Sequence, residues 1–414
     1  MKPWIERYGP WIALFVASAA YYSRFIHDPD NGVLLYSQAA QCLIDNRILQ
    51  ECSQYFTYPP ALAFVFVPLV QMPMGLRLLI WYVVTIAASV GAFKCAEVVG
   101  SRLFAERFSA TEMAWVRVIA IILSLKFVLA VLENQAYEAL SFIFIMLGLV
   151  GLSERRELLG GAAIGVAAAL KATPLVFFPY LLVKRRFAAA AAFLAAMLVV
   201  GYSPDLVFTP TGGAHGYFNT WLQQVAGASV YDPNLAKLQF WTGANAFNHS
   251  LRGAVSLQID DVKQAGLHKL VLYGLDFAFM AFAAALIMLR KAERDMLAID
   301  ASILLIAMLM LSPMTSRSHY EVLVLPYVML SMVVLRDRVT HKLGIAVLAV
   351  SFFFLTATSN DVVGKPLSDW AYFHSFLVIG ALTLMIYIAV IVWEPAVLRE
   401  AKPFAWRWPR LARA

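Results

Sequence analysis

The stretch YFHSFLVIGALTLMIYIAVIVW, residues 372–393, contains no Asp, Glu, Lys or Arg side chain. As an α-helix it is about 33 Å long, enough to cross the hydrocarbon core of a bilayer, which is about 30 Å thick. Lipid offers the backbone no hydrogen-bond partner, so a segment that enters it satisfies its own amide groups by forming a helix. This stretch therefore predicts a membrane-spanning helix.

The same pattern recurs along the chain, whose 414 residues are 61% hydrophobic and only 14% charged. A soluble domain carries about 45–50% apolar and about 25% charged residues. No run of alternating hydrophobicity appears, so the spans are helices and not barrel strands. The sequence predicts an all-α polytopic bundle with about twelve spans. They lie near residues 8–25, 75–95, 113–132, 135–153, 158–171, 173–183, 187–203, 269–289, 297–314, 320–335, 343–358 and 372–393.

The apolar segment YPPALAFVFVPLVQMP, residues 58–73, does not fit this series, because it is short and contains Pro68. Counting it as a full span would give thirteen spans and would place Lys94, Arg102 and Arg107 on the outer side, against the charge bias. We therefore expect a partial or re-entrant helix here, with thirteen spans as the alternative.

The net charge of +7 reflects topology, because the basic residues gather in short loops between apolar spans. Lys and Arg accumulate in cytoplasmic loops, so these loops mark the inner side and argue against nucleic acid as a partner. They lie at Arg155-Arg156, Lys184-Arg185-Arg186, Arg290-Lys291, Arg336 and Arg338, and in the tail, residues 394–414.

The predicted organisation is a single membrane-embedded domain, residues 1–414, with both termini inside. Its large outward loops are residues 26–57 and 204–268. The basic tail interleaves arginines with Trp406 and Trp408. This composition suits an anionic headgroup layer, so membrane lipids are expected partners.

Two of the three cysteines, Cys42 and Cys52, share the first outward loop, whereas Cys95 lies alone near the inner side. In an oxidising compartment the first two can close a disulfide; the alternative is a pair of free thiols. The seven histidines do not cluster with the cysteines, so we predict no metal site and no cofactor.

Two carboxylates, Asp28 and Asp30, follow the first span directly. A carboxylate at the membrane surface acts as a general base for a sugar hydroxyl when it lies within hydrogen-bond reach. Asp, Pro, Asn and Gly are also ordinary turn residues, and the residues by themselves favour a solvated turn. Both interpretations stay open at this point.

Three cations lie on the predicted outer side: Lys171, Arg252 and Arg317. A lysine inside a membrane helix costs about 2.5–3.5 kcal/mol, so Lys171 is either snorkelling at a helix end or holding an anion. Arginine grips phosphate through a planar two-donor fork. His319, one residue before a span, either binds phosphate or sugar or caps the helix. Together these groups suit a polyprenyl phosphate site, an apolar groove with a positive end.

Several segments in order resemble glycosyltransferase family 87. They are Tyr36 with Ala39-Ala40, Phe56-Thr57-Tyr58-Pro59-Pro60, Lys171-Ala172-Thr173-Pro174, Asn248-His249-Ser250-Leu251, and Ser312-Pro313 followed by His319-Tyr320. The third is similar to a Lys-x-x-Pro segment, the fourth to Asn-x-Ser-Leu and the fifth to Ser-Pro…His-Tyr. The resemblance covers roughly residues 28–330. One departure is Asn134-Gln135-Ala136-Tyr137, where the family has Gly-Gln-x-Asn, so a second Asn is missing.

The resemblance implies a GT-C fold and a polyprenol-phosphate sugar donor, usually mannose. It implies an essential Asp in the first loop, carried here onto Asp30 with Asp28 as the alternative, and a functional histidine, carried onto His319. Tyr58, Gln135 and Asn248 are the expected substrate-binding residues. The expected enzyme is a hexosyltransferase of the bacterial inner membrane, with its active site on the periplasmic side and a lipid or glycan acceptor.

The predicted mechanism is a single displacement that inverts the anomeric centre. Asp30 takes the proton from an acceptor hydroxyl, whose oxygen attacks the anomeric carbon. The polyprenyl phosphate leaves, and its charge is stabilised by the donor phosphate-binding set. That set is Lys171, Arg252, Arg317 and His319.

Two other classes of protein compete with this interpretation. A secondary transporter would use the intramembrane charges Asp276, Asp300 and Lys126. Transporters place such groups near the midplane, often within internal repeats, and no repeat is evident here. A non-catalytic membrane protein of envelope assembly is the second alternative, and it predicts no transferase activity.

Overall fold

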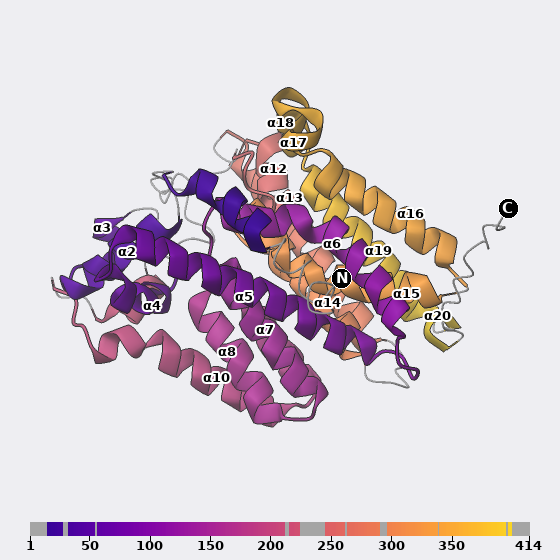
Figure 1. Cartoon of the computed structure of the whole chain (residues 1–414), viewed down its shortest axis with the longest axis horizontal. Coiled ribbons are helices and arrows are strands. Elements are labelled where there is room, and N and C mark those ends of the chain that lie inside the picture. Colours follow the sequence, from indigo (N-terminus) through magenta and orange to yellow (C-terminus); the bar gives the residue numbers. More distant parts are fainter. Residues whose placement is uncertain are drawn as a thin grey trace, which may run out of the picture.

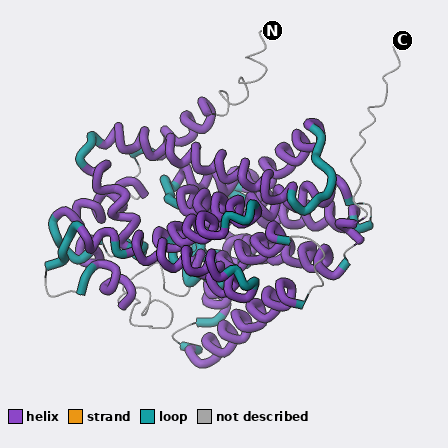
Figure 2. Tube along the Cα trace, turned by 90° about the horizontal axis from the view of Figure 1, so that it is seen from below, coloured by secondary structure: helices purple, strands orange, loops and turns teal. Residues whose placement is uncertain are grey.

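The computed structural model describes residues 15–27, 32–53, 56–211, 215–223, 245–260, 263–289, 296–337, 339–394 and 396–399. Within these ranges every regular element is a helix and no strand occurs, as Figure 2 shows. The all-α prediction is therefore confirmed. Asp28, Asp30, most of the basic tail and residues 224–244 of the long loop lie outside the described residues.

Among the described residues, five helices are long and apolar enough to cross a membrane. They are α5 (Met74–Ser101), α6 (Ala110–Glu133), α13 (Ala265–Met288), the run of η6 (Arg317–Leu323) into α15 (Val324–Arg336), and α19 (Phe376–Trp393). α15 lies in the centre of the bundle with all its residues buried. α13 leaves large apolar side chains exposed, including Leu270 at 72% and Phe277 at 71%. Such a surface suits lipid and not water.

Eight further apolar helices are shorter. They are α2 (Gly32–Ile44), α4 (Pro60–Val70), α7 (Glu138–Ser153), α8 (Glu157–Leu170), η2 with α9 (Thr173–Val183), α10 (Phe187–Gly201), α14 (Leu297–Met310) and α16 with η7 (His341–Ala357). α4 has 11 residues. It is therefore about 17 Å long, too short to cross a bilayer core of about 30 Å alone. This length agrees with the partial helix expected for residues 58–73.

Small residues let the helices approach closely. A Cβ added at Gly161 of α8 would lie 2.0 Å from the Ala189 carbonyl oxygen of α10, and one at Gly165 would lie 2.2 Å from that of Phe193. Close backbone contact through a small-xxx-small pattern is the usual way in which membrane helices pack. Figure 1 shows α7, α8 and α10 together on one side of α5 and the helices α14 to α19 on the other. α5 contacts both groups through α7 and α15.

The loops at one end of the bundle, here named the basic end, carry those of the predicted cytoplasmic arginines and lysines that the structure describes in contact with one another's helices, among them Lys184 and Arg186. Arg102 lies 3.9 Å from Glu154, and Arg186 donates to the Leu152 carbonyl at 3.0 Å. Nearby, Lys184 pairs with Asp300 at 3.3 Å. These contacts join the α5, α7–α8, α9–α10 and α14 ends.

The opposite end, here named the site end, is built around the turn between α6 and α7. Gln135 adopts a left-handed conformation, with φ 48°, which reverses the chain. Its carbonyl accepts from Trp81 Nε1 at 2.8 Å, and the Asn134 carbonyl accepts from the Gly32 amide at 3.0 Å. The turn therefore fixes α5 and the start of α2 beside the first residues of α7.

A disulfide joins Cys42, on α2, to Cys52, on α3 (Leu49–Cys52), with Cα atoms 6.2 Å apart. It closes the loop around Asn46, whose carbonyl accepts from the Thr211 amide at 2.7 Å. Cys95 is a free thiol on α5. The bridge therefore holds the first outward loop against the segment that follows α10.

Candidate active site

Glu138, the first residue of α7, is the centre of the polar network at the site end. Its side chain is 5% exposed. The turn at Gln135 places Glu138 at the N-terminus of α7, where the helix dipole stabilises its carboxylate. Two residues from distant elements, Lys171 and His319, gather around it, beside its neighbour in sequence, Tyr137.

Lys171 reaches Glu138 from the end of α8. Its backbone leaves the helix in an extended conformation, and Pro174 starts η2 immediately afterwards. The Nζ atom lies 3.3 Å from Glu138 Oε1 and 5.4 Å from the centre of the Tyr137 ring. Burial lowers the pKa of the Lys171 ammonium, and the Glu138 carboxylate opposes this shift. The charge of Lys171 is thus supported chiefly by the Glu138 carboxylate, with Glu321 also within electrostatic reach.

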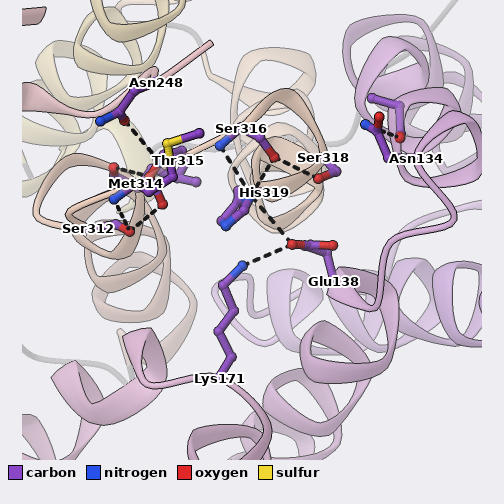
Figure 3. A network of polar contacts seen from close by, with 12 residues as sticks. Asn134, Glu138, Lys171, Asn248, Ser312, Met314, Thr315, Ser316, Ser318 and His319 are labelled. Atoms are coloured by element: carbon purple, nitrogen blue, oxygen red, sulfur yellow. Dashed lines mark hydrogen bonds and ion pairs between the residues drawn. The ribbon is translucent and has the colours of Figure 1, made fainter. Parts of the chain in front are cut away.

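His319 reaches the same carboxylate from η6, as Figure 3 shows. Its Nδ1 atom lies 3.4 Å from Glu138 Oε1 and 2.8 Å from the Ser316 hydroxyl. Both contacts use Nδ1, and no hydrogen bond from the described part of the chain engages Nε2. The ring is therefore oriented through one nitrogen and leaves the other for a substrate.

A small cavity of about 20 Å³ lies between these groups. Such a volume holds about one water molecule. Its lining is Glu138, Ser141, Phe142, Ile145, Lys171, Thr173, Met308, Leu309, His319 and Val322. Three of its oxygens lack a hydrogen-bond partner within the described residues: Glu138 Oε2, Ser141 Oγ and Thr173 Oγ1. Buried polar atoms are nearly always hydrogen-bonded, so these three oxygens are available to bind a polar ligand.

Three tyrosines form one wall beside Glu138. The ring centres of Tyr58 and Tyr137 are 4.8 Å apart, and those of Tyr36 and Tyr137 are 5.9 Å apart. All three rings lie within electrostatic reach of the Glu138 carboxylate. Tyr58, expected to bind substrate, therefore stands next to the network, where its ring offers a surface for a sugar.

The three predicted phosphate-binding cations do not meet at one place. Only Lys171 lines the cavity. Arg317 pairs with Glu133, at the end of α6, at 3.1 Å. Arg252, on α12 (Leu251–Gln258), lies within electrostatic reach of Asp276 on α13.

Gln135 and Asn248, the other expected substrate-binding residues, hold loops in place. Gln135 is fully buried and donates to the Phe25 carbonyl at 3.2 Å. Asn248 Oδ1 accepts from the Thr315 amide at 3.1 Å, and its Nδ2 donates to the Pro313 carbonyl at 3.0 Å. Neither side chain lines the cavity. Asn248 instead fastens the Asn-His-Ser-Leu segment to the loop that precedes His319 (Figure 3).

The acidic turn lies outside the described residues, but the residue that follows it does not. Gly32 packs so tightly on the α6–α7 turn that a Cβ there would lie 2.5 Å from the Gln135 carbonyl oxygen. Only glycine fits this contact. Gly32, two residues after Asp30 in the sequence, thus contacts the turn that leads into Glu138.

Glu138, Ser141 and Thr173 are the site residues that sequence reasoning missed. Glu138 comes one residue after the Asn134–Tyr137 motif and opens a long apolar run. A carboxylate at such a position is a signal that could have found it. Among the described residues, no group of three or more His, Cys, Asp or Glu side chains is arranged to hold a metal ion.

Comparison with known proteins completes the description. The sequence pattern of glycosyltransferase family 87 matches residues 56–313. A polyprenol-phosphate-mannose-dependent alpha-(1-2)-phosphatidylinositol pentamannoside mannosyltransferase from Mycobacterium tuberculosis is 31% identical over 273 residues, which is 65% of this chain and 56% of that protein. The protein of the same description from Mycolicibacterium smegmatis is 29% identical over 279 residues, 66% of this chain and 60% of that protein. This chain spans less than two thirds of the length of either relative.

Proposed function

The chain belongs to glycosyltransferase family 87, and we propose that it transfers a hexose, namely mannose, from a polyprenyl-phosphate donor to a lipid or glycan acceptor. One observation carries the proposal. Lys171, from the Lys-x-x-Pro segment, and His319, from the Ser-Pro…His segment, meet at a single buried carboxylate, Glu138. Two motif residues far apart in sequence thus line one polar cavity in an apolar bundle.

The proposed topology follows from the two ends of the bundle. Lys and Arg accumulate on the cytoplasmic side of inner-membrane proteins. The basic end then faces the cytoplasm and the site end faces the periplasm, where no nucleotide sugar is needed because the donor is carried by lipid. Of the twelve predicted spans, five correspond to helices long enough to cross alone, whereas shorter helices such as Thr173–Val183 are as short as α4, so the count of twelve stays a prediction.

The proposed reaction is a single displacement at the anomeric carbon. Asp30, or Asp28 in its place, takes the proton of the acceptor hydroxyl as that oxygen bonds to the anomeric carbon. The bond from that carbon to the phosphate oxygen breaks, and the polyprenyl phosphate leaves with the electron pair. Its negative charge is stabilised by the Lys171 ammonium and by His319 Nε2–H. One displacement inverts the centre, so a β-linked donor gives an α-linked product.

Glu138 acts in this proposal as a positioning residue. It holds Lys171 through Oε1, while the Ser316 amide and hydroxyl orient the His319 ring through Nδ1, and together these contacts pre-organise the cationic end of the donor groove. Its other oxygen, without a partner in the described chain, receives a donor hydroxyl or a water. The Arg317 and Arg252 side chains, which do not line the cavity, contribute to the electrostatic field and not to direct contacts with the leaving phosphate.

The transporter alternative draws no support from its charged residues. Asp300 pairs with Lys184 and accepts from the Tyr180 hydroxyl at 3.1 Å, at the basic end. Asp276 lies within reach of Arg252. Neither lies at the cavity, so the two carboxylates do not form a shared ion path with Glu138.

The deciding experiment uses purified protein in vesicles with radiolabelled polyprenyl-phosphate mannose and lipid acceptors. We expect a labelled lipid product, and none from a Lys171→Gln variant that is equally well folded. A matched Lys365→Gln variant changes a lysine outside the cavity and should keep full activity. Label that accumulates inside the vesicles without a new product would support the transporter. Neither product nor uptake would favour the non-catalytic alternative.

A further inference from the structure

Lys126 is a second lysine in an apolar helix, and the proposed reaction does not use it. It lies on α6, about two turns before Glu133, and is partly buried. Its Nζ atom donates to the Leu355 carbonyl at 2.9 Å and lies 5.4 Å from the centre of the Tyr372 ring. Within the described chain no carboxylate lies within ion-pair distance of it. An ammonium inside a membrane protein that lacks a counter-charge is costly and is usually functional.

The carbonyl that receives Lys126 belongs to η7 (Phe353–Ala357), a π-helical turn at the end of α16. π-turns are rare and occur frequently at functional sites, because the wider turn shifts the hydrogen-bond ladder. The Tyr372 ring belongs to α18 (Lys365–Phe373), a short helix at the same end of the bundle. Figure 1 shows α18 beside α12 and the end of α16. Gln258 of α12 donates to the Phe373 carbonyl at 3.3 Å.

Two further nitrogen-bearing side chains face the same place. The His249 ring packs on Tyr372 with ring centres 5.1 Å apart, and Arg317 lies beside the Tyr372 hydroxyl. Lys126 and Arg317 lie within electrostatic reach of each other and of His249. These four residues, Lys126, His249, Arg317 and Tyr372, are named the Lys126 cluster.

The backbone of His249 is fixed by hydrogen bonds, and its Nε2 atom is available to bind a ligand. Its amide donates to the Thr315 carbonyl at 2.7 Å, and its carbonyl accepts from the Tyr320 hydroxyl at 2.7 Å. The side chain is 2% exposed, and Nε2 has no partner within the described residues. Burial, together with the charges of Lys126 and Arg317, lowers the pKa of His249 to about 3. The ring is therefore neutral at pH 7 and can donate to an anion without adding charge.

The charges around the cluster do not balance. Arg317 shares its charge with Glu133, and Asp361 lies within electrostatic reach of Lys126. Arg24 adds a further positive charge near Arg317 and Glu133. Among the described residues, three cations therefore face two carboxylates, and of these carboxylates Glu133 is the one that forms an ion pair, with Arg317. An anion with several acceptor oxygens would remove the repulsion between Lys126 and Arg317.

The surroundings of the cluster indicate the source of that anion. Exposed apolar side chains lie on the same elements, with Phe353 on η7 at 53% and Leu367 and Trp370 on α18 at 50% each. An amphipathic helix with an exposed Trp is typical of the membrane interface, where lipid headgroups lie. Charge and apolar surface together fit a group that carries phosphate on an acyl or prenyl chain.

We propose that the Lys126 cluster binds the phosphate of a membrane lipid at a second site, separate from the cavity of Lys171, Glu138 and His319. His319 is within electrostatic reach of both Lys171 and His249, so the two sites adjoin. The chemistry shared by the possible ligands is a phosphate ester on an apolar chain.

The test measures lipid binding to the delipidated full-length protein in neutral detergent, by native mass spectrometry. The probes are phosphatidylglycerol, phosphatidylcholine, polyprenyl phosphate and inorganic phosphate. We expect phosphatidylglycerol to bind and Lys126→Gln to weaken that binding about tenfold or more, the loss of a charged hydrogen bond. Lys365→Gln, at an exposed lysine of α18, and Lys171→Gln should leave phosphatidylglycerol binding unchanged. If only polyprenyl phosphate depends on Lys126, the site is selective for prenyl phosphate and the proposal stands in that form.

Three outcomes would overturn the proposal. Equal binding by wild type and Lys126→Gln would show that the lysine holds no headgroup. Phosphatidylcholine binding as tight as phosphatidylglycerol would remove the role of net charge. Inorganic phosphate that competes at the same concentration as the lipid would make this a site for free phosphate. Since the readout is binding, the result does not depend on transferase activity.

A melting experiment separates ligand binding from a structural role. If Lys126 is kept for an anion, Lys126→Met removes an uncompensated cation and should keep or raise the melting temperature of the lipid-free protein. If it serves only to fasten the Leu355 carbonyl, the same change lowers that temperature, and the proposal fails.

Discussion

The Arg336–Glu112 pair at the basic end and the cavity at the site end both contain buried charges, but only the pair has nearly all its polar atoms bonded within the described residues. At the basic end, Arg336 is 1% exposed and donates to both oxygens of Glu112, at 3.0 and 3.1 Å. It also donates to the Glu106 and Arg107 carbonyls, and its guanidinium stacks on Phe108 at 3.6 Å. Four of its five N–H groups are thus used. The charge is saturated by the protein itself.

At the site end, the buried polar groups remain incompletely paired. Glu138 Oε2, Ser141 Oγ, Thr173 Oγ1 and His249 Nε2 have no partner within the described residues. Leaving such groups open costs about 1–3 kcal/mol each, so a protein keeps them where a ligand completes them. The comparison teaches that a buried charge indicates a structural role when it is saturated and a binding role when it is not.

The largest expected effect concerns the acidic turn next to the site end. Asp30→Asn keeps the shape of the side chain but removes its basicity. Transfer should fall by about 10²–10⁴-fold, the usual contribution of a general base. The measurement is the rate of labelled product formation, with donor binding and melting temperature followed in parallel and expected to change little. Asp28→Asn is the matched control and should have a smaller effect.

Other outcomes for this turn are equally clear. Activity lost only in Asp28→Asn would move the base two residues upstream. Full activity in both single variants and in the double variant would reject a carboxylate base in this turn, and with it the proposed displacement.

At the basic end the same kind of change should act on stability. Arg336→Gln leaves Glu112 buried without its partner, which should lower the free energy of unfolding by about 3–5 kcal/mol. Unfolding by denaturant in detergent measures this. Arg117→Gln is a matched control, because Arg117 pairs with Glu97 while 40% exposed, and its loss should cost much less. Arg336→Met with Glu112→Leu should recover most of the stability. A large loss of activity in a fully stable Arg336→Gln protein would contradict the assignment.

The disulfide should contribute about 2–3 kcal/mol, the loop-closure entropy of a bridge ten residues apart. Cys42→Ser should therefore destabilise the protein by this amount, and so should a reductant acting on wild type. The reductant should add nothing in Cys42→Ser, whereas Cys95→Ser should respond to it like wild type. Insensitivity of wild type to a reductant that reaches the thiols would count against a contribution from the bridge.

The fold was largely predictable from the sequence, because long apolar runs of helical length leave the backbone no other choice. The site was predictable only in part. Lys171 and His319 were found from their motifs, but the convergence of Arg317 with them was not observed. Arg317 comes two residues before His319, and residues two apart on a helix point to different sides. One therefore faces Glu133 and the other Glu138. Which face a polar residue occupies depends on packing that a single sequence does not contain.

The smallest expected effect tests whether Glu138 supports the charge of Lys171. Burial lowers the pKa of Lys171, and Glu138 opposes that shift, with Glu321 also within electrostatic reach. The ammonium is present below its pKa and lost above it, so donor binding should fall as pH rises through this value. Glu138→Gln removes the opposing carboxylate, so the alkaline limit of donor binding should move to lower pH. The measurement is the donor affinity at a series of pH values from about 6 to about 10, a range that ends near the ordinary pKa of lysine. Glu133→Gln is the matched control, because Glu133 pairs with Arg317 and not with Lys171. The alkaline limit of donor binding by this variant should equal that of wild type. A limit that does not move in Glu138→Gln, or that moves equally in both variants, would mean that the pair at 3.3 Å does not set the charge of Lys171, and that the site end is held together by packing alone.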